Sequence, residues 1–333
     1  MNIDEIARRA NVSTATVSRT LNKTGVVRPE TARRVWRAAA QLNYYPNSHA
    51  RALVSGRSRL LGLIVSDITN PFFPELIRSF EALATQHQYD LILTSTDYQT
   101  TLMTNCLRRM LERKVDGVAI MTSEMDAGLI KELSRRGVPL VFMDVGDVGP
   151  KMSHVLIDYA HGVHQVVDHV TALGHRRIAF ISGPLDLQSA RVRRQAFLDG
   201  MRDHGLKVEA ALVREGTHTA EGGQHAMESL LRLKKHPTAV ICSNDWTAIG
   251  ALHAIDAAGL TVPDDVSLLG FDDIPLVSYT NPPLTSVRMS AGDVGTTAFD
   301  ALFRLIGGDR SKGSVYHVPT SLVVRASSAR PRR

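Results

Sequence analysis

The sequence predicts an N-terminal all-α head with a helix-turn-helix, a hinge helix, and an α/β body of two doubly wound lobes with parallel sheets. Two short helical patterns separated by a three-residue break open the chain. From residue 60 onward, short apolar runs alternate with helical stretches. Residues 1–59 hold eleven Lys and Arg against three acids, a balance of +8, whereas the remainder has a balance of −2. A basic head on a near-neutral body is typical of a polyanion-binding protein, although a solvated basic face would give the same pattern.

The head begins with apolar residues at helical spacing, which predict a first helix over residues 3–10. Asn11-Val12-Ser13 interrupts the pattern, and Ser13 can cap a second helix over residues 14–22. Pro29 suits the first turn of a third helix. Two helices joined by such a turn, with a third as a brace, form a helix-turn-helix whose second helix enters the DNA major groove. A three-helix bundle without a nucleic-acid role remains the alternative.

Specific motifs within this head resemble the DNA-binding domain of the LacI/GalR family of bacterial transcription regulators. The segments are VSTATVSRTLN and VRPETARRVWRAAAQLNYYPNSHARALVSGRS, with the TVSR core, the NYYPN step and the ARAL segment in the family's order. The resemblance implies that Thr14, Ala15 and Arg19 read bases, and Arg19 can make two hydrogen bonds to a guanine edge. It also implies contacts to DNA phosphates, and such contacts set the register of the protein without reading sequence. These contacts are assigned to Ser13, Thr16, Ser18 and Asn22.

A short hinge follows Pro46, over residues 47–54. Eight residues are too few for a stable isolated helix in water, so we expect this segment to fold only with support. The resemblance implies that DNA and the partner's hinge supply that support. It assigns Leu53 as a wedge in the minor groove, Ala50 as a close minor-groove contact and Arg51 as a phosphate contact. A plain linker residue is the alternative for Leu53.

The body is predicted from its apolar runs, which are LLGLIVSD, DLILTSTD, GVAIM, PLVFMD, HVLID, RIAFISG, AVICSND and SLLGFDD. Continuous apolar strands separated by helices predict parallel sheets covered on both faces. We expect a first lobe over about residues 60–158 and a second over about 159–285, with the chain after 286 returning to the first. Polar residues follow the strands, and ligands of open α/β sheets bind at these carboxyl ends.

Several enzyme classes lack their motifs in this chain. There is no G-x-G-x-x-G after the first strand, no G-x-x-x-x-G-K-[ST] and no G-x-S-x-G, so dinucleotide binding, nucleotide hydrolysis and hydrolase chemistry are not predicted. His161, His164 and His169 share one helix at spacings of three and five, which favours surface or lobe contacts over a metal site. We predict no enzyme activity, no cofactor and no metal.

The composition predicts the compartment. Cys106 and Cys242 are far apart and lack metal-ligand spacing, which fits a reducing cytoplasm. No apolar run approaches 18 residues, and the N-terminal residues do not form a signal peptide. We therefore expect a cytoplasmic protein.

The body also resembles the effector-binding domain of the LacI/GalR family, which is similar to periplasmic sugar-binding proteins. The matching segments are DITNPFF, GHRRIAFISGP, SARVRRQAF, AVICSNDWTAIGAL, VPDDVSLLGFDD and PPLTSVR. The resemblance implies that Arg193 clamps effector oxygens and that Asn244 and Asp272 hydrogen-bond the effector. Five further contacts are implied for Phe72, Phe73, Asp144, Ser189 and His218.

These residue types suit a polyhydroxyl ligand. Alternatively, Asn244 and Asp272 could cap helices and Arg193 could form a salt bridge between the lobes. The run of Arg191, Arg193 and Arg194 could instead favour an acidic or phosphorylated sugar.

The domains implied are a helix-turn-helix domain over 1–46, a hinge helix and linker over 47–59, and an effector-binding and dimerisation domain over 60–333. We predict a homodimeric repressor that binds a near-palindromic double-stranded DNA operator under the control of a carbohydrate effector between the lobes. The terminal SLVVRASSARPRR carries no heptads, so we expect a dimer rather than a tetramer and a disordered tail. The alternatives are a solute-binding protein without a regulatory role, which the basic head disfavours, and an α/β enzyme.

Overall fold

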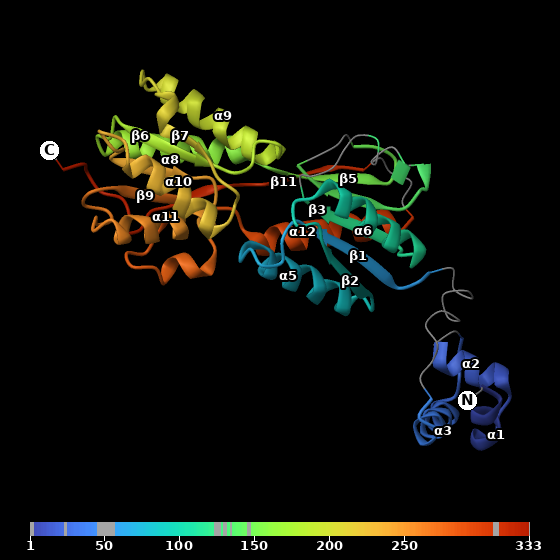
Figure 1. Ribbon diagram of the computed structural model, residues 1–333. Helices are drawn as coiled ribbons and strands as arrows, with labels where there is room; N and C mark the ends of the chain where they lie inside the picture. Colours follow the sequence, from blue (N-terminus) through green and yellow to red (C-terminus); the bar gives the residue numbers. More distant parts are fainter. Residues whose placement is uncertain are drawn as a thin grey trace. The chain divides into compact units, whose positions relative to one another are not determined.

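Figure 1 shows the computed structural model of the chain, which divides into two compact units, Met1–Arg59 and Leu60–Arg333. The structure describes residues 3–22, 25–44, 57–122, 128, 132–133, 135–144, 148–308 and 313–332. The predicted hinge contacts Ala50, Arg51 and Leu53 lie outside the described residues.

The first unit is a three-helix head, as the sequence predicts. Its helices are α1 (Ile3–Ala10), α2 (Thr14–Asn22) and α3 (Pro29–Gln41). The turn between α1 and α2 is possible because Asn11 adopts a left-handed backbone with φ 51°, a conformation that Asn tolerates. The core is closed by side chains from all three helices, namely Ile6, Ala7, Ala10, Val17, Leu21, Val35, Ala38 and Ala39.

The first lobe of the body is a six-stranded parallel sheet in the order β11-β5-β4-β3-β1-β2. Its strands are β1 (Leu60–Val65), β2 (Asp90–Ser95), β3 (Gly117–Met121), β4 (Leu140–Met143), β5 (Met152–Ile157) and β11 (Val315–Val318). Its helices are α5 (Phe72–Gln86), α6 (Thr100–Glu112) and α12 (Ala291–Ile306).

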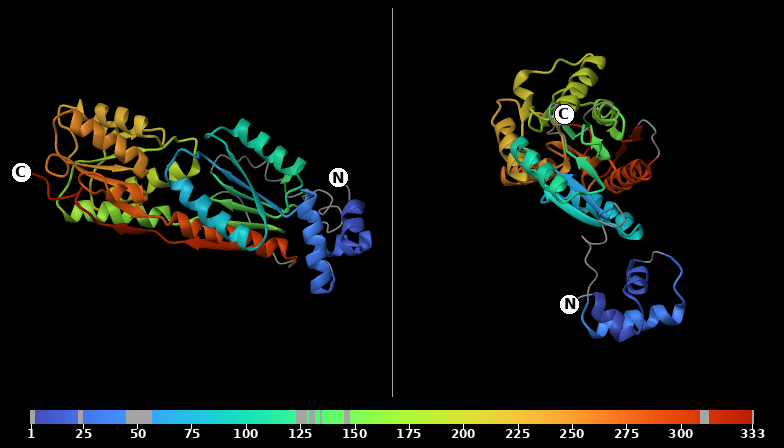
Figure 2. Two further views of the ribbon diagram at one scale, coloured as in Figure 1. Left: turned by 90° about the horizontal axis from the view of Figure 1, so that it is seen from below. Right: turned by 90° about the vertical axis from the view of Figure 1, so that its right-hand side faces the viewer.

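Alternate residues of β1 enter different hydrophobic clusters. Leu61 and Leu63 pack in the cluster that contains α5 and α12 residues, whereas Ile64 packs with α6 residues. The sheet is therefore covered on both faces, which explains its continuous apolar strands (Figure 2).

The second lobe is a six-stranded sheet in the order β12-β10-β9-β8-β6-β7. Its strands are β6 (Ile178–Ser182), β7 (Val213–Glu215), β8 (Ala239–Cys242), β9 (Ser267–Asp272), β10 (Thr285–Arg288) and β12 (Ser321–Val323), of which β12 is antiparallel to β10. Its helices are α8 (Tyr159–Ala172), α9 (Gln188–Asp203), α10 (Ala220–Leu231), α11 (Asp245–Ala257) and the short 3-10 turns η1 (Ala210–Leu212) and η2 (Pro275–Ser278).

The chain passes between the lobes three times, after β5, after β10 and after β11. The predicted return to the first lobe is confirmed by α12 and β11. Phe299 of α12 meets Phe80 of α5 edge-to-face, with ring centroids 5.5 Å apart, and His87 stacks on its ring. This aromatic cluster fixes α12 against the first lobe.

The prediction of a disordered tail is wrong. Ser327 is completely buried in the second lobe, where its hydroxyl donates to the Leu268 oxygen and accepts from the Thr285 amide. His175 also lies 2.8 Å from the Ala329 oxygen. The small Ser and Ala side chains allow the tail to lie against β9, so its backbone groups are paired and ordering is favourable.

Candidate functional site

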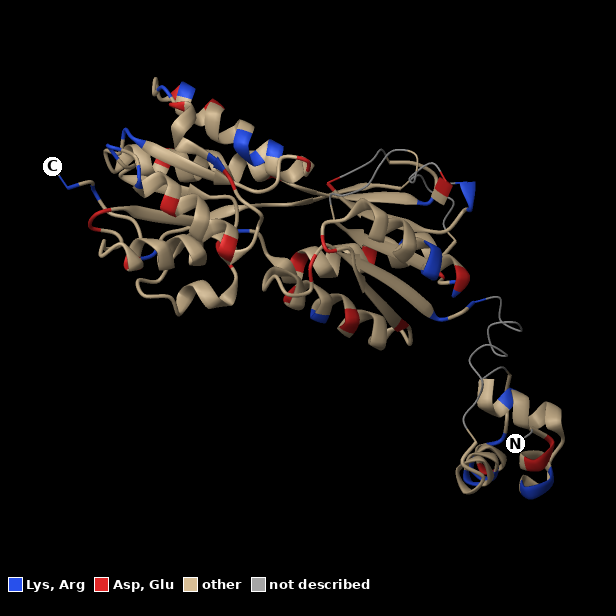
Figure 3. Cartoon of the chain, viewed as in Figure 1, with Lys and Arg blue, Asp and Glu red and all other residues tan. Residues whose placement is uncertain are grey.

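The predicted DNA contacts of the head lie on the side of α2 away from the core. Ser13, Thr14, Ala15 and Arg19 are exposed, and Thr16, Ser18 and Asn22 are half-buried. The Ser13 hydroxyl accepts a hydrogen bond from the backbone N–H of Thr16 at 3.2 Å and so caps α2. The side-chain amide of Asn22 donates to the Ser18 hydroxyl at 3.2 Å. The contacts themselves stay predictions. Figure 3 shows the Lys and Arg residues of the head among few acidic ones.

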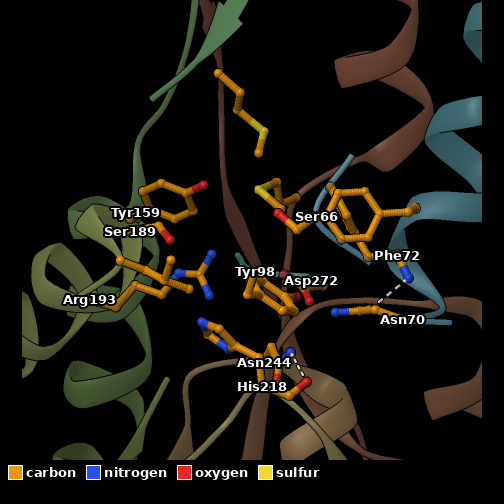
Figure 4. Close-up of a pocket in the computed structure, with 14 residues that line it drawn as sticks. Ser66, Asn70, Phe72, Tyr98, Tyr159, Ser189, Arg193, His218, Asn244 and Asp272 are labelled. Carbon is orange, nitrogen blue, oxygen red and sulfur yellow. Dashed lines mark hydrogen bonds between the residues drawn. The ribbon is translucent and has the colours of Figure 1, made fainter. Parts of the chain in front are cut away.

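The body has a cavity between its lobes that is partly open to solvent, and its empty volume, including that open space, is about 450 Å³ (Figure 4). Residues after strands of both sheets line it, for example Ser66 after β1 and Asn244 after β8. This is the carboxyl edge of the sheets, where ligands of such folds bind. Its walls are formed by Ser66, Asn70, Phe72, Phe73, Tyr98, Met143, Tyr159, Leu187, Ser189, Arg193, His218, Asn244, Asp272 and Met289.

Arg193 is the central cation of the cavity. Its guanidinium carbon lies 4.3 Å from the ring centroid of Tyr159 and 4.6 Å from that of Phe271. Its Nη1 donates to the backbone oxygen of Ser243 at 2.6 Å, whereas its buried Nε has no hydrogen-bond partner in the described structure. The rings hold the guanidinium plane in place, and the unpaired donor can serve a ligand oxygen. No described salt bridge joins Arg193 across the lobes.

Asn244 caps α11, as the alternative interpretation held. Its side-chain oxygen accepts from the Thr247 amide at 2.9 Å, and its side-chain nitrogen donates to the His218 oxygen at 3.2 Å. Asn244 therefore both lines the cavity and fixes His218. His218 has a left-handed backbone with φ 62° and is buried beside Arg193. Burial, followed by the Arg193 charge, lowers the pKa of His218 to about 3, so its imidazole is neutral.

Asp272 ends β9 and does not cap a helix, because η2 begins later, at Pro275, without a side-chain cap. Burial raises the pKa of Asp272 to about 7, and the Arg193 charge opposes the shift. Asp245 nearby is fully buried, and burial and then the Asp272 charge raise its pKa well above the usual range. We expect Asp245 to keep its proton while Asp272 titrates near neutrality.

Aromatic rings close the cavity from both lobes. Phe72 and Phe73 meet edge-to-face with centroids 5.3 Å apart at the start of α5. Tyr98 of the first lobe lies 6.1 Å, centroid to centroid, from the His218 ring of the second. Figure 4 shows these side chains around the same space as Arg193. Such rings offer apolar faces to a ligand whose edges are polar.

Asp144 differs from the other predicted effector contacts. It is buried and does not line the cavity, because its carboxylate accepts the Tyr159 hydroxyl at 2.5 Å. The other seven predicted residues all line the cavity.

Sequence reasoning missed seven wall residues, which are Ser66, Asn70, Tyr98, Met143, Tyr159, Leu187 and Met289. Ser66 and Tyr98 are neighbours of Asp67 and Asp97, which follow β1 and β2 in the sequence. Since successive side chains of a strand face opposite ways, a shift of one residue at a strand end changes which side chain faces the ligand. This alternation was the signal in the sequence by which missed wall residues at the strand ends could have been found.

The neighbours of Arg193 point elsewhere. Arg191 donates to the backbone oxygens of Leu185 and Asp186, and Arg194 lines a separate hollow with Glu215. Only one of the three arginines therefore faces the cavity. Among the residues that the structure describes, no cluster of three or more His, Cys, Asp or Glu could hold a metal, and no helix is long and apolar enough to cross a membrane.

A helix-turn-helix head on a two-lobed body with an inter-lobe cavity defines a ligand-responsive DNA-binding regulator. Residues 2–47 match the profile of bacterial regulatory proteins of the lacI family, and residues 167–328 match the periplasmic binding protein-like domain. The HTH-type transcriptional repressor PurR of Photobacterium profundum is 32% identical over 98% of both chains. Catabolite control protein A of Priestia megaterium is also 32% identical, over 98% of both.

Similar solved structures support the same family assignment. The lac repressor dimer bound to operator and the anti-inducer ONPF has a TM-score of 0.88 at 30% identity, covering 99% of both chains. The transcriptional regulator CelR in complex with cellobiose has a TM-score of 0.73 at 27% identity, covering 98% of this chain and 100% of that one. This chain belongs to the LacI family of bacterial transcription regulators, and the predictions of family, fold class and regulatory function are confirmed.

Proposed function

We propose that this regulator is a repressor whose operator affinity is controlled by a neutral polyhydroxyl effector, a sugar or sugar derivative, bound between the lobes. The observation that carries the proposal is Arg193, a buried cation with an unpaired donor that packs against two rings at the cavity wall. Related regulators support the ligand class, since their structures contain cellobiose and ribose. A family regulator acts on chromosomal DNA, so we also propose a cytoplasmic location.

The charges of the cavity favour a neutral ligand over a phosphorylated one. His218 is neutral, and Arg193, the one cation among the described wall residues, faces Asp272, which is partly ionised at neutral pH. Arg191 and Arg194, which could have bound a phosphate, are directed elsewhere. A phosphate would therefore meet Asp272 without an excess of positive charge, whereas hydroxyl groups can donate to Asp272 and accept from Arg193.

The DNA-binding proposal assigns base reading to Thr14, Ala15 and Arg19 of α2, with phosphate contacts from Ser13, Thr16, Ser18 and Asn22. Short polar side chains let the helix backbone approach the groove closely, and all seven residues are half-buried or exposed. The hinge contacts lie outside the described residues and stay predictions; they are assigned to Ala50, Arg51 and Leu53. Two heads of a homodimer would bind the half-sites of a near-palindrome.

The proposal is tested by calorimetry of the full chain with ribose, cellobiose, o-nitrophenyl galactoside and ribose 5-phosphate. In parallel, duplexes selected by the protein from a random library would be titrated by fluorescence anisotropy with and without each compound. We expect a neutral sugar to bind and to change operator affinity. Binding of the phosphate ester alone would contradict the neutral class, and no palindromic duplex among those selected would contradict the dimeric DNA contact.

Arg19→Ala is expected to weaken operator binding by about 1–3 kcal/mol and to relax selectivity at one base pair, because a bidentate contact to guanine is lost. Selection of duplexes by the variant, followed by anisotropy, measures both effects. Arg9→Ala is the matched control, since Arg9 lies on α1, bonds Gln41 and carries the same charge. Equal losses in the two variants would show that Arg19 contributes only bulk charge.

Effector affinity is expected to rise with pH between about 6 and 8, because a sugar hydroxyl donates to the ionised form of Asp272, whose pKa is about 7. At pH 6 only about one-tenth of this carboxyl is ionised, so the loss is roughly tenfold. The raised pKa also means that the contribution of Asp272 to stability falls as the pH rises from about 4 to 7.

Calorimetry in buffers of different ionisation enthalpy would detect the proton released on binding. Asp272→Asn should abolish this release, and Asp300→Asn, on the exposed side of α12, should leave it intact. A flat pH profile in the unsubstituted protein would refute the assignment of Asp272 as a hydroxyl acceptor.

A further inference from the structure

Tyr159 contacts both lobes with different parts of its side chain. It is the first residue of α8 and follows the crossover from β5, so its backbone belongs to the second lobe. Its ring is one of the two aromatic rings that contact the guanidinium of Arg193. Its hydroxyl donates to Asp144, which directly follows β4 of the first lobe.

The Asp144 end of this link is held by the first lobe and by Tyr159. Asp144 has a left-handed backbone with φ 62°, and its amide donates to the Val155 oxygen of β5 at 3.2 Å. One carboxylate oxygen accepts from Tyr159, while the other is buried without a hydrogen-bond partner. Burial raises the pKa of Asp144 to about 6, although the Tyr159 hydroxyl and Arg193 oppose the shift. A backbone hydrogen bond from Ile157 also opposes the shift, and the Tyr159 hydroxyl is the side-chain donor to this carboxylate.

The Arg193 end is the group that a ligand would move. The guanidinium packs against the adjacent Tyr159 and Phe271 rings, whose centroids are 5.9 Å apart, and its Nε is unpaired. A ligand oxygen that draws the guanidinium into the cavity must shift it against the Tyr159 ring. A shift of the ring moves the hydroxyl, which is rigidly attached to it, and changes the bond to Asp144. Figure 4 shows Tyr159 next to Arg193 at the second-lobe wall of the cavity.

We propose that Tyr159 is a positioning residue that transmits the state of Arg193 in the second lobe to Asp144 in the first lobe. The inference rests on the proposed function for its biological meaning, because effector binding is the event that would perturb Arg193. The link itself is present in the structure described above. It consists of one cation–ring contact and one hydrogen bond on a single rigid side chain.

The test is a double-mutant cycle in the full chain without any ligand. The substitution Arg193→Gln perturbs the cation, and Tyr159→Phe removes only the hydroxyl and keeps the ring. The readout is hydrogen–deuterium exchange in the peptide that contains the Asp144 amide, which is bonded to Val155. Tyr279→Phe, at a side chain that is 83% exposed, is the matched control for loss of a phenol hydroxyl.

We expect Arg193→Gln to raise exchange at Asp144 by about threefold or more in the otherwise unchanged protein and by less than about 1.5-fold in the Tyr159→Phe background. A purely structural role of Tyr159 would give equal factors in both backgrounds, and that result would overturn the proposal. So would no change on Arg193→Gln alone. If Arg193→Gln does not fold, Arg193→Lys changes the contact with the Tyr159 ring instead, because an ammonium cannot stack as the planar guanidinium does.

The same variants separate this inference from the proposed function. If a sugar is found to bind, the Tyr159→Phe variant, when saturated with that sugar, should show an effect on operator affinity about tenfold smaller than the unchanged protein shows. If no sugar binds, the proposed effector class fails, whereas the exchange cycle still decides whether Tyr159 couples Arg193 to Asp144.

Discussion

Replacing Arg193 by alanine is expected to lower effector affinity by roughly 30- to 1,000-fold, which corresponds to about 2–4 kcal/mol. The guanidinium is buried, it packs against two aromatic rings, and its Nε has no hydrogen-bond partner in the described structure. A charged donor of this kind gives hydrogen bonds about twice as strong as neutral ones, and its removal also leaves the Ser243 oxygen without its donor. Isothermal titration calorimetry with the effector identified by the sugar panel measures the loss.

Arg191→Ala is the matched control for this substitution. Arg191 lies on the same helix and carries the same charge, but it bonds the Leu185 and Asp186 oxygens outside the cavity. Its replacement should change effector affinity by less than about threefold, because its guanidinium is bonded outside the cavity and does not line it. Similar losses in both variants would mean that the effector responds to the net charge of α9 and that Arg193 is no clamp. Operator binding without effector should persist in both.

Phe299→Ala is expected to destabilise the body by about 3–5 kcal/mol, because it removes a fully buried ring from a packed aromatic cluster. Phe299 joins α12 to α5 through Phe80 and carries the stacked ring of His87. Urea unfolding followed by far-UV circular dichroism gives the change in the free energy of unfolding.

Leu102→Ala, on the partly exposed side of α6, is the comparison and should cost less than about 1 kcal/mol. If Phe299→Ala unfolded at the same urea concentration as Leu102→Ala, the packing of α12 on the first lobe would be wrong. The result therefore tests the return of the chain to that lobe.

Periodic features of the sequence were sufficient to predict the architecture. The apolar spacing in residues 3–42 and the unbroken apolar strands after residue 60 each reflect a repeating geometry, and those patterns survive without knowledge of tertiary contacts. The tail was predicted wrongly because its Ser- and Arg-rich composition is typical of disorder. Its order depends on specific partners, such as Ser327 with Leu268 and Thr285, that lie far away in the sequence.

The residues of the candidate site that stand in a sequence motif could be predicted. The residues whose role depends on facing the opposite lobe were harder to predict. Arg193, Asn244 and Asp272 stand in motifs that resemble those of the family, and the structure brings them to one cavity. Tyr98 and Tyr159 were missed because their roles come from facing the opposite lobe. Asp144 was assigned to the effector, but the Tyr159 hydroxyl occupies one of its oxygens, which a linear pattern cannot reveal.

The three passages of the chain between the lobes affect how the protein is made. The first lobe needs α12 and β11, which end at Val318, and the second needs β12 and the tail beyond it. Neither sheet can therefore be completed before β11 or β12 has been synthesised, although domains synthesised as continuous segments commonly fold one after another. The head, by contrast, has its whole core within its first 44 residues. During synthesis, the groove-binding part can thus be complete well before the part that would sense the effector.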